Sequence, residues 1–338
     1  MQSTILNDLL KEYYDIRQEN NLKLLNRKHE VENLCPRIAE IDSELSNVSI
    51  SAAKNILKKN DIKFLDELKS NIKSLKQQKK SLLKQLGKPE DYLDPIYTCN
   101  SCLDTGYIST TNGSVMCKCL KQKLFDMQYN KGYSYNLKKE NFNTFNFNLY
   151  SDEKNLNKYG FELSPRENIK QIYDASKHFI KNFNNPDEKS LIFSGETGLG
   201  KTFLSNCIVT ELLKCGYTVM YQTAPVMLDS LVADLFAKPE NKSNISENLL
   251  SVDLLVIDDL GTETMNSMKF TELYKIINPR LLNQGDSITK TIISTNLDLV
   301  SLYKTYDERL VSRFIGYYNI YRFYGEDIRL KEQKGTLW

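Results

Sequence analysis

Residues 195–202 read GETGLGKT, which matches the phosphate-binding pattern G-x-x-x-x-G-K-[ST] at each constrained position. The context also fits, because LIFS (191–194) is typical of a short buried strand and FLSNCIVTELLK (203–214) of a helix. Glycines let the backbone turn tightly, so that successive N–H groups and the helix N-terminus point at phosphates. A chance glycine-rich turn is the alternative, and both flanking elements argue against it. The stretch predicts a site for a nucleoside triphosphate.

Two side chains of this loop have defined roles in phosphate binding. Lys201 is expected to reach the β- and γ-phosphates, and the Thr202 hydroxyl to hold Mg²⁺. The complete loop comprises Gly195, Glu196, Thr197, Gly198, Leu199, Gly200, Lys201 and Thr202. We therefore expect a nucleotide and Mg²⁺ as cofactors.

Two later segments end in polar residues after an apolar strand. LLVIDD (254–259) ends in two carboxylates, and the carboxyl end of such a strand lies beside the phosphate loop. Asp258 is then placed to hold Mg²⁺, and Asp259 to orient the attacking water. TIISTN (291–296) ends in Asn296, whose side chain can help to orient that water. A surface turn is the alternative for both segments, and for Asn296 it stays open.

The segment DERLVSRF (307–314) places Arg309 and Arg313 four residues apart, on one face of a helix. A guanidinium is planar and permanently charged, which suits contact with a γ-phosphate. Supplied from a neighbouring subunit, it can stabilise charge in the transition state. Surface salt bridges explain the pair equally well. Arg329 in FYGEDIR (323–329) is a weaker candidate for the same role.

Four cysteines form two close pairs. Cys99 and Cys102 make a C-x-x-C, and Cys117 and Cys119 a C-x-C, in a segment (97–120) rich in turn residues. Four thiolates can close a tetrahedral Zn²⁺ shell, in which no position stays open for catalysis. Unrelated thiols or a redox pair are the alternatives, and the paired spacing favours structural zinc. Seven cysteines with this pairing fit a reducing cytosol better than a disulfide framework.

Residues 1–90 are polar and patterned for helices, with Pro36 expected to open one and Asn60-Asp61 to connect two. An a/d stripe typical of a helical hairpin or small bundle comprises Leu34, Ile38, Ile41, Leu45 and Val48, then Leu65, Leu68, Ile72, Leu75, Leu82 and Leu86, with Lys79 in the seam. From Lys54 to Lys88 there are eleven lysines and three acidic residues. Such a run can contact DNA but is more often a solvated face, which we favour. We interpret this part as a docking module.

The remaining chain divides into a connector (121–160) and a domain (161–338) in which helices and strands alternate. That alternation predicts an α/β fold with a parallel sheet and flanking helices. Net charge is +2, which excludes a global attraction to polyanions. We expect no membrane-spanning helix and no secretory signal, and hence a cytoplasmic protein.

The order GETGLGKT, LLVIDD, TIISTN, DERLVSRF resembles the AAA+ ATPases, and more narrowly the bacterial replicative helicase loaders of the DnaC/DnaI type. The resemblance covers residues 97–338. It implies an AAA+ P-loop domain without a C-terminal lid, ATP as the nucleotide, Asn296 as the sensor-1 residue and Arg313 as the arginine finger, with Arg309 supporting it. It further implies that APVMLDSLVADLF (224–236) faces single-stranded DNA. Asp259 departs from the usual glutamate, so slow hydrolysis is expected.

These features favour an ATP-dependent loader whose N-terminal helices bind a ring helicase of the DnaB type. Its ATPase domains would associate with one another on single-stranded DNA. Two alternatives remain open. One is a transposition helper ATPase that coats DNA and recruits a transposase, although such proteins usually lack a zinc segment behind a helical arm. The other is a nucleotide-binding adaptor with negligible hydrolysis.

Overall fold

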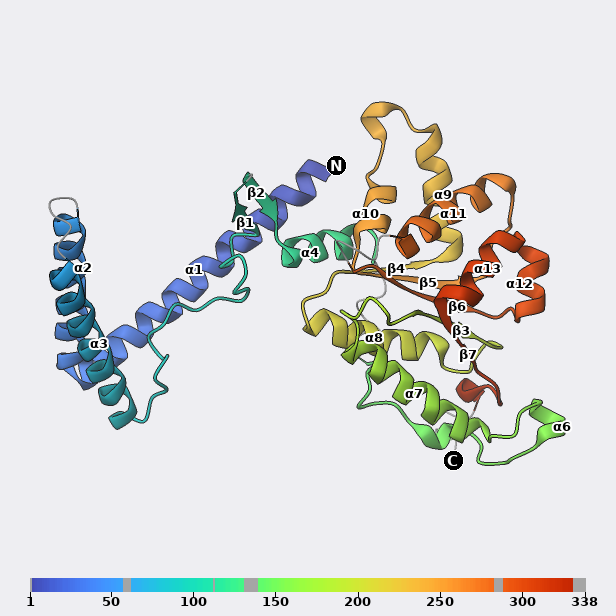
Figure 1. The fold of residues 1–338 in the computed structure, drawn as a ribbon, viewed down its shortest axis with the longest axis horizontal. Coiled ribbons are helices and arrows are strands. Elements are labelled where there is room, and N and C mark those ends of the chain that lie inside the picture. Colours follow the sequence, from blue (N-terminus) through green and yellow to red (C-terminus); the bar gives the residue numbers. More distant parts are fainter. Residues whose placement is uncertain (1, 57–61, 112, 131–138, 283–287, 331–338) are drawn as a thin grey trace. The chain divides into compact units, whose positions relative to one another are not determined.

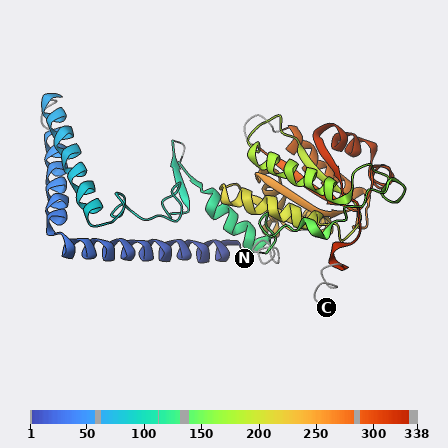
Figure 2. The same cartoon turned by 90° about the horizontal axis from the view of Figure 1, so that it is seen from below.

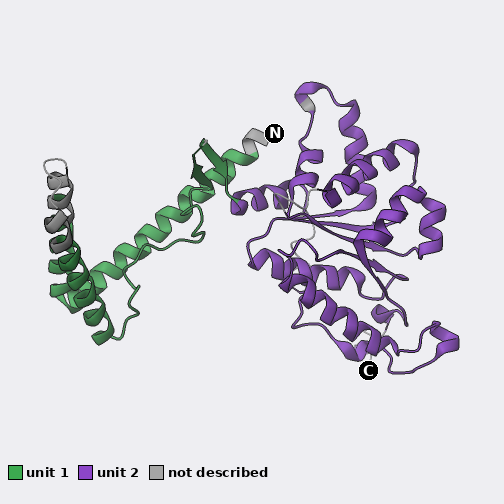
Figure 3. Cartoon of the chain, viewed as in Figure 1, with its two compact units in different colours: residues 1–117 green, residues 118–338 purple. Residues whose placement is uncertain are grey.

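The computed structural model describes residues 2–56, 62–111, 113–130, 139–282 and 288–330, which form two compact units (Figures 1 and 3). Residues 1–117 make up unit 1 and residues 118–338 unit 2. The described residues of the expected connector, 121–130 and 139–160, fall within unit 2. No helix among the described residues combines the length and the apolar character needed to cross a membrane.

Unit 1 contains three helices, α1 (Gln2–Leu34), α2 (Pro36–Ile56) and α3 (Ile62–Gln85), and α2 packs beside α3 (Figure 1). Pro36 opens α2 as predicted, whereas the expected connection at 60–61 lies outside the described residues. The predicted seam is confirmed at Ile38, Ile41 and Leu75, which are buried. Leu34 is wrong as a seam residue: it ends α1 and is exposed.

The seam between α2 and α3 also contains a lysine. Lys79 is half-buried and donates a hydrogen bond of 2.6 Å to Asp42, which explains how a cation is tolerated at an apolar position. Nearer the end of α3, Leu83 is fully buried, while the predicted Leu82 is only partly buried. Leu83 packs in one cluster with Val31, Ile38 and Leu93, so the described helices share a continuous apolar contact.

Two short antiparallel strands, β1 (Tyr107–Thr110) and β2 (Gly113–Met116), separate the cysteine pairs. Cys99 and Cys102 lie in the turn-rich segment before β1, as expected. The second pair does not lie on a hairpin turn. Cys117 directly precedes α4 (Lys118–Gln128) and Cys119 lies in its first turn, because a helix begins immediately after β2.

Unit 2 is built on a five-stranded parallel sheet in the order β4-β5-β6-β3-β7. The strands are β3 (Ser190–Ser194), β4 (Val219–Thr223), β5 (Leu254–Leu260), β6 (Lys290–Thr295) and β7 (Tyr318–Arg322). The first four confirm the predicted alternation. The fifth, β7, was not predicted, because it follows a helix directly with no turn residues between them.

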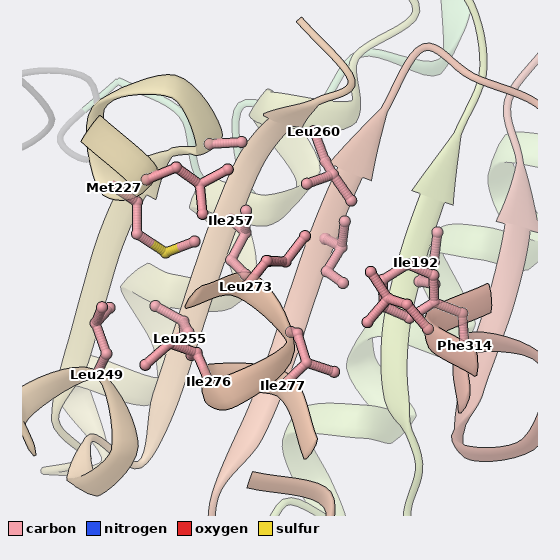
Figure 4. Packing of buried hydrophobic residues seen from close by; sticks show 14 of the residues in the cluster. Ile192, Met227, Leu249, Leu255, Ile257, Leu260, Leu273, Ile276, Ile277 and Phe314 are labelled. Atoms are coloured by element: carbon pink, nitrogen blue, oxygen red, sulfur yellow. The ribbon is translucent and has the colours of Figure 1, made fainter. Parts of the chain in front are cut away.

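Helices cover both faces of the sheet (Figures 1 and 2). One face packs against α7 (Pro165–Lys181) and α8 (Lys201–Lys214), the other against α9 (Ala224–Phe236), α10 (Ile245–Ser251), α11 (Ser267–Leu282) and α13 (Glu308–Tyr317). The latter core is shown in Figure 4, where Leu273, Ile276 and Ile277 of α11 lie against Leu255 and Ile257 of β5. Short elements complete the unit: η1 (Phe147–Leu149), α6 (Leu156–Tyr159), η2 (Pro239–Asn241) and α12 (Leu299–Thr305).

The segment after the cysteines covers β4, which is an edge strand of this sheet. Gln122 accepts a hydrogen bond of 2.6 Å from the Val219 backbone N–H, and Asn130 accepts one of 2.9 Å from that of Tyr221. Phe125 of α4 is buried in the core beside them. These side chains replace the neighbouring strand that β4 lacks, which protects the edge from pairing with other chains.

Candidate functional site

The phosphate loop follows β3 and leads directly into α8. Gly200 is the residue before the helix and has a left-handed φ of 89°. The Lys201 side chain is buried and curls back over the loop, donating to the carbonyl oxygens of Gly195 (2.6 Å) and Glu196 (2.7 Å). Burial lowers the pKa of Lys201, and the carboxylates of Asp259 and Asp258 oppose that effect. The loop thus holds a cation at the place where phosphate oxygens are expected.

Two segments distant in sequence hold the loop from outside. The Tyr150 hydroxyl donates to the Leu199 carbonyl (3.0 Å), and the Ile328 N–H donates to the Gly198 carbonyl (2.9 Å). Gly198 must be glycine, because its φ is 75° and an added Cβ would meet the Asp327 carboxylate at 2.1 Å. The predicted loop residues therefore lie together as one fixed structure, with Glu196 and Thr197 exposed at its tip.

Asp258 is the best-held carboxylate of the site. It is 3% exposed and accepts hydrogen bonds from three hydroxyls: Thr202 (3.2 Å), Tyr221 (2.8 Å) and Ser294. These residues come from α8, β4 and β6. The structure therefore brings Thr202 and Asp258 together, as the sequence predicts for a metal site.

The oxygen atoms of this cluster fit Mg²⁺. Neighbouring ligands of an octahedral Mg²⁺ at about 2.1 Å lie about 3.0 Å apart. The separation of 3.2 Å between Thr202 Oγ1 and Asp258 Oδ2 is close to that value. Both are hard oxygen ligands, and the hydroxyls of Tyr221 and Ser294 bond the same carboxylate, which fixes its orientation.

The backbone changes conformation at Asp259. Its φ is 56°, and the pairing of β5 with β6 is irregular between Ile257 and Leu260. Such a bulge redirects a side chain, and aspartate tolerates the left-handed region better than glutamate does. Burial, and next the Asp258 carboxylate, raise the pKa of Asp259, so its charged form requires a higher pH than for a solvated aspartate. The departure from glutamate thus has a conformational reason.

Asn296 directly follows β6 and is exposed, with its amide oxygen beside Gly261 in the loop after β5. This places it at the same edge of the sheet as Asp259. The position is compatible with orienting a water molecule near the γ-phosphate, and that role remains a prediction.

The arginines of α13 do not converge on the phosphate loop of their own chain. Arg309 is exposed and pairs with Asp307 at 2.9 Å. Arg313 is half-buried, donates to Asn278 (2.5 Å) and stacks over the Tyr274 ring at 5.3 Å. An action on a neighbouring subunit's nucleotide remains a prediction for both.

Arg329 and Arg322, by contrast, lie close to the loop. The charge of Arg329 lowers the pKa of Asp259, against the larger effect of burial. The charges of both arginines help to lower the pKa of Lys201. Arg322 also donates to the Ser194 hydroxyl at 3.1 Å. Sequence analysis missed Arg322 together with its strand, and it missed Tyr221 and Ser294. The sequence signal for Tyr221 and Ser294 would have been a hydroxyl side chain within a strand that is predicted to be buried.

The four cysteines form one cluster. Their sulfur atoms all lie within 4.8 Å of one another, and Cys99 Sγ is 3.9 Å from Cys117 Sγ. A tetrahedron of thiolates around Zn²⁺ at about 2.3 Å has edges of about 3.8 Å. The cluster therefore fits a structural metal ion.

The buried carboxylate of Asp104 orders the first cysteine turn. It accepts hydrogen bonds from the N–H groups of Thr98 (2.9 Å) and Cys99 (2.7 Å) and from the Asn20 side chain of α1 (3.1 Å). These bonds fix the direction of Cys99 and join the turn to the long helix.

A first prediction concerns the support of Asp258. Tyr221→Phe removes one hydrogen bond to the carboxylate and leaves the ring in place, so we expect the apparent Mg²⁺ affinity to fall about 10-fold or more. Magnesium titrations of nucleotide hydrolysis measure the effect. Tyr173→Phe is the control, because its hydroxyl bonds a backbone carbonyl at 3.3 Å outside this cluster. Equal magnesium requirements for the two variants would contradict the assignment.

A second prediction concerns the cysteines. We expect one equivalent of Zn²⁺ per chain, and its loss in Cys102→Ser, since the fourth thiolate completes the shell. Metal content after gel filtration, measured by atomic emission, checks this. Cys215→Ser, an exposed cysteine outside the cluster, is the control and should retain the metal. Unchanged zinc in Cys102→Ser would exclude the four-cysteine shell.

Comparisons with known proteins agree with this geometry. A family model described as "IstB-like ATP binding protein" matches residues 123–335. The replicative helicase loader DnaC of Buchnera aphidicola (subspecies Acyrthosiphon pisum) is 28% identical over 146 residues, covering 43% of this chain and 57% of that protein. DnaC of Escherichia coli K12 is 29% identical over 124 residues, covering 37% and 49%. The chain thus spans about half the length of the curated relatives it matches.

Among solved structures, the crystal structure of the DnaC helicase loader is similar over 46% of this chain and 89% of that chain, with 25% identity and a TM-score of 0.41. The family model covers well over half of the 338 residues, from α4 to beyond β7. This protein therefore belongs to the IstB-like ATP-binding proteins and carries an AAA+ domain of the IstB/DnaC type.

Proposed function

We propose that this protein is an ATP-driven loader that places a ring-shaped replicative helicase on single-stranded DNA. The observation that carries the proposal is the joint presence of a complete nucleotide cluster around Thr202 and Asp258 and a separate helical unit. The cluster supplies a nucleotide-controlled switch, and the helical unit supplies a surface for a partner. The curated relatives named replicative helicase loaders support this reading.

In the proposed mechanism, ATP lies along residues 195–202, and Lys201 exchanges its two carbonyl contacts for phosphate oxygens. Thr202 and Asp258 would hold Mg²⁺, which would supply positive charge beside the β- and γ-phosphates. Asp259 accepts a hydrogen bond from the attacking water and orients it, with Asn296 assisting from the next strand. Because the aspartate is shorter than glutamate, this water is held less closely, and slow hydrolysis follows.

Self-association of the ATPase domain is part of the proposal. Arg313, with Arg309 beside it on α13, would reach the γ-phosphate of a neighbouring subunit, where a guanidinium stabilises transition-state charge. Side-by-side subunits would then present α9 to single-stranded DNA. Phe236 at the end of α9 is 71% exposed, and an exposed aromatic ring can stack on a base.

For the helicase contact we propose one face of α1. Tyr14, Leu22 and Leu25 are all more than half exposed and lie at i, i+8 and i+11, which places them on the same side of the helix. Exposed apolar side chains grouped in this way are typical of a protein interface. Structural Zn²⁺ on the four cysteines would keep the cysteine segment rigid. The Asn20–Asp104 hydrogen bond would hold that segment beside α1.

A third prediction tests hydrolysis. Asp259→Asn keeps a residue that tolerates the left-handed backbone but removes the charge that orients water. We expect unchanged ATP affinity and a loss of turnover of about 100-fold or more, as for removal of a general base. Fluorescent-nucleotide titration and phosphate release measure the two effects. Lys201→Ala is the contrasting variant, which should lose binding as well. Undiminished turnover in Asp259→Asn would contradict the assigned role.

A fourth prediction tests the loader proposal. The full chain, mixed with the replicative helicase of its own organism and ATP, should form a complex whose mass is measured by light scattering. Leu22→Asp with Leu25→Asp should abolish the complex, because charge is placed in an apolar contact, while ATP hydrolysis stays unchanged. Lys23→Asp, an exposed residue of the same helix, is the control. Absence of a complex with the unaltered chain would exclude the loader and favour a transposition helper.

A further inference from the structure

Five lysines of α3 lie on one face of the helix. Lys69, Lys73, Lys76, Lys80 and Lys84 follow at intervals of four, three, four and four residues, so that each helical turn presents one cation. The row spans about 22 Å at a rise of 1.5 Å per residue. Between Lys69 and Lys84 the sequence holds no acidic residue. We call this row the lysine stripe.

The stripe lines a groove and is not part of the packing between helices. A hollow of about 700 Å³ is bordered by all five lysines, with Glu90 at one side. The buried residues of α3, Leu75 and Leu83, lie elsewhere on the helix, and the lysine that contributes to helix packing is Lys79. The buried positions of α3 and the lysine that bonds α2 are thus residues outside the stripe.

The positive charge is local to this helix. In α1, five lysines and arginines are offset by six acidic residues. One acidic contact borders the groove within the described part of unit 1, the Lys80–Glu90 pair at 3.1 Å, in which both side chains are more than half exposed. An exposed ion pair contributes little, so it yields readily to a stronger anion. Although the net charge of the chain is only +2, five lysines thus lie together beside one hollow.

The chemistry of the stripe favours a phosphodiester backbone over a protein surface. Protein interfaces are depleted in lysine and rely on buried aromatic or arginine anchors, and the residues that line this groove include no aromatic residue and no arginine. Lysine binds phosphate as a compact point charge, and contacts to phosphate carry no direct information on base sequence. A single row of cations matches the phosphates of one strand.

We propose that the lysine stripe is a second nucleic-acid site, located in unit 1, which binds the backbone of single-stranded DNA without sequence preference. It is separate from α9 and from the nucleotide cluster, and it requires neither ATP nor a helicase. A loader with such a site would hold the strand at two places along the chain.

The test is the salt dependence of binding. Fluorescence anisotropy of a labelled oligothymidylate is followed with the full chain, without nucleotide, over a range of salt concentrations. The logarithm of affinity falls with the logarithm of salt concentration by about 0.7 per phosphate neutralised on a single strand. The triple variant Lys73→Gln, Lys76→Gln, Lys80→Gln removes three cations, so we expect the slope to decrease by about 2.

The matched control removes the same charge elsewhere in unit 1. Lys11, Lys23 and Lys28 of α1 are exposed, and their change to glutamine should leave the slope close to that of the unaltered chain. Helical circular dichroism, which should be equal in all three proteins, verifies that unit 1 is folded, and equal ATP hydrolysis without DNA verifies unit 2. An equal slope for the stripe variant and its control would overturn the proposal.

Two further measurements distinguish single-stranded DNA from duplex DNA and from an acidic protein surface as the ligand of the stripe. A duplex oligonucleotide that loses as much affinity as the single strand in the stripe variant would overturn the preference for one strand. A stripe variant that binds oligothymidylate normally but loses the helicase complex would overturn the nucleic-acid assignment in favour of an acidic protein surface. The outcome does not depend on the loader proposal, because the binding assay contains no helicase and no ATP.

Discussion

The nucleotide site of unit 2 depends on one hydrogen-bonded contact, that between Thr202 and Asp258. Thr202 lies in the first turn of α8, after β3, and Asp258 lies near the end of β5, and β6 lies between these two strands. The contact therefore forms only when the sheet has the order β5-β6-β3 and the strands end at the same edge. Ser294 on the intervening β6 completes it by donating to Asp258 and accepting from the Asp259 N–H (3.0 Å). A buried carboxylate without these hydroxyl donors would be costly, so site and sheet stabilise one another.

The phosphate loop requires more of the chain than its eight residues. Tyr150 comes from the segment before α7, and Ile328 from the segment after β7, yet both bond carbonyls of the loop. This explains why the residues that were predicted to form a connector are part of the same folded unit as the sheet. It also explains the aromatic residues of that segment: Phe145 and Phe147 pack against Tyr173 of α7, which fixes the position of Tyr150.

The sequence predicted the parts of this fold that have a strict local pattern. The loop, four strands and the two carboxylates were found because glycine spacing and apolar runs encode them directly. The strand β7 and the hydroxyls of Tyr221 and Ser294 were not found, since their importance arises only when β4, β5 and β6 lie side by side. The left-handed conformation of Asp259 was likewise invisible. In unit 1, the prediction that Leu34 lies in the seam was wrong, because α1 ends at Leu34 and a new helix begins at Pro36. The heptad pattern does not predict this helix boundary.

The buried pair of Glu263 and Tyr306 connects the loop that follows Asp259 with α13, the helix that carries Arg309. Glu263 accepts a hydrogen bond from the Gly261 N–H (2.9 Å), two residues after Asp259, and another from the Tyr306 hydroxyl. Burial, followed by the bond to Glu263, raises the pKa of Tyr306, so the phenol stays protonated and donates. Tyr306 directly precedes Asp307, whose side chain caps the helix that carries Arg309. The loop that follows Asp259 and the residue that precedes the cap of α13 thus both bond the Glu263 carboxylate, which links the two elements by hydrogen bonds.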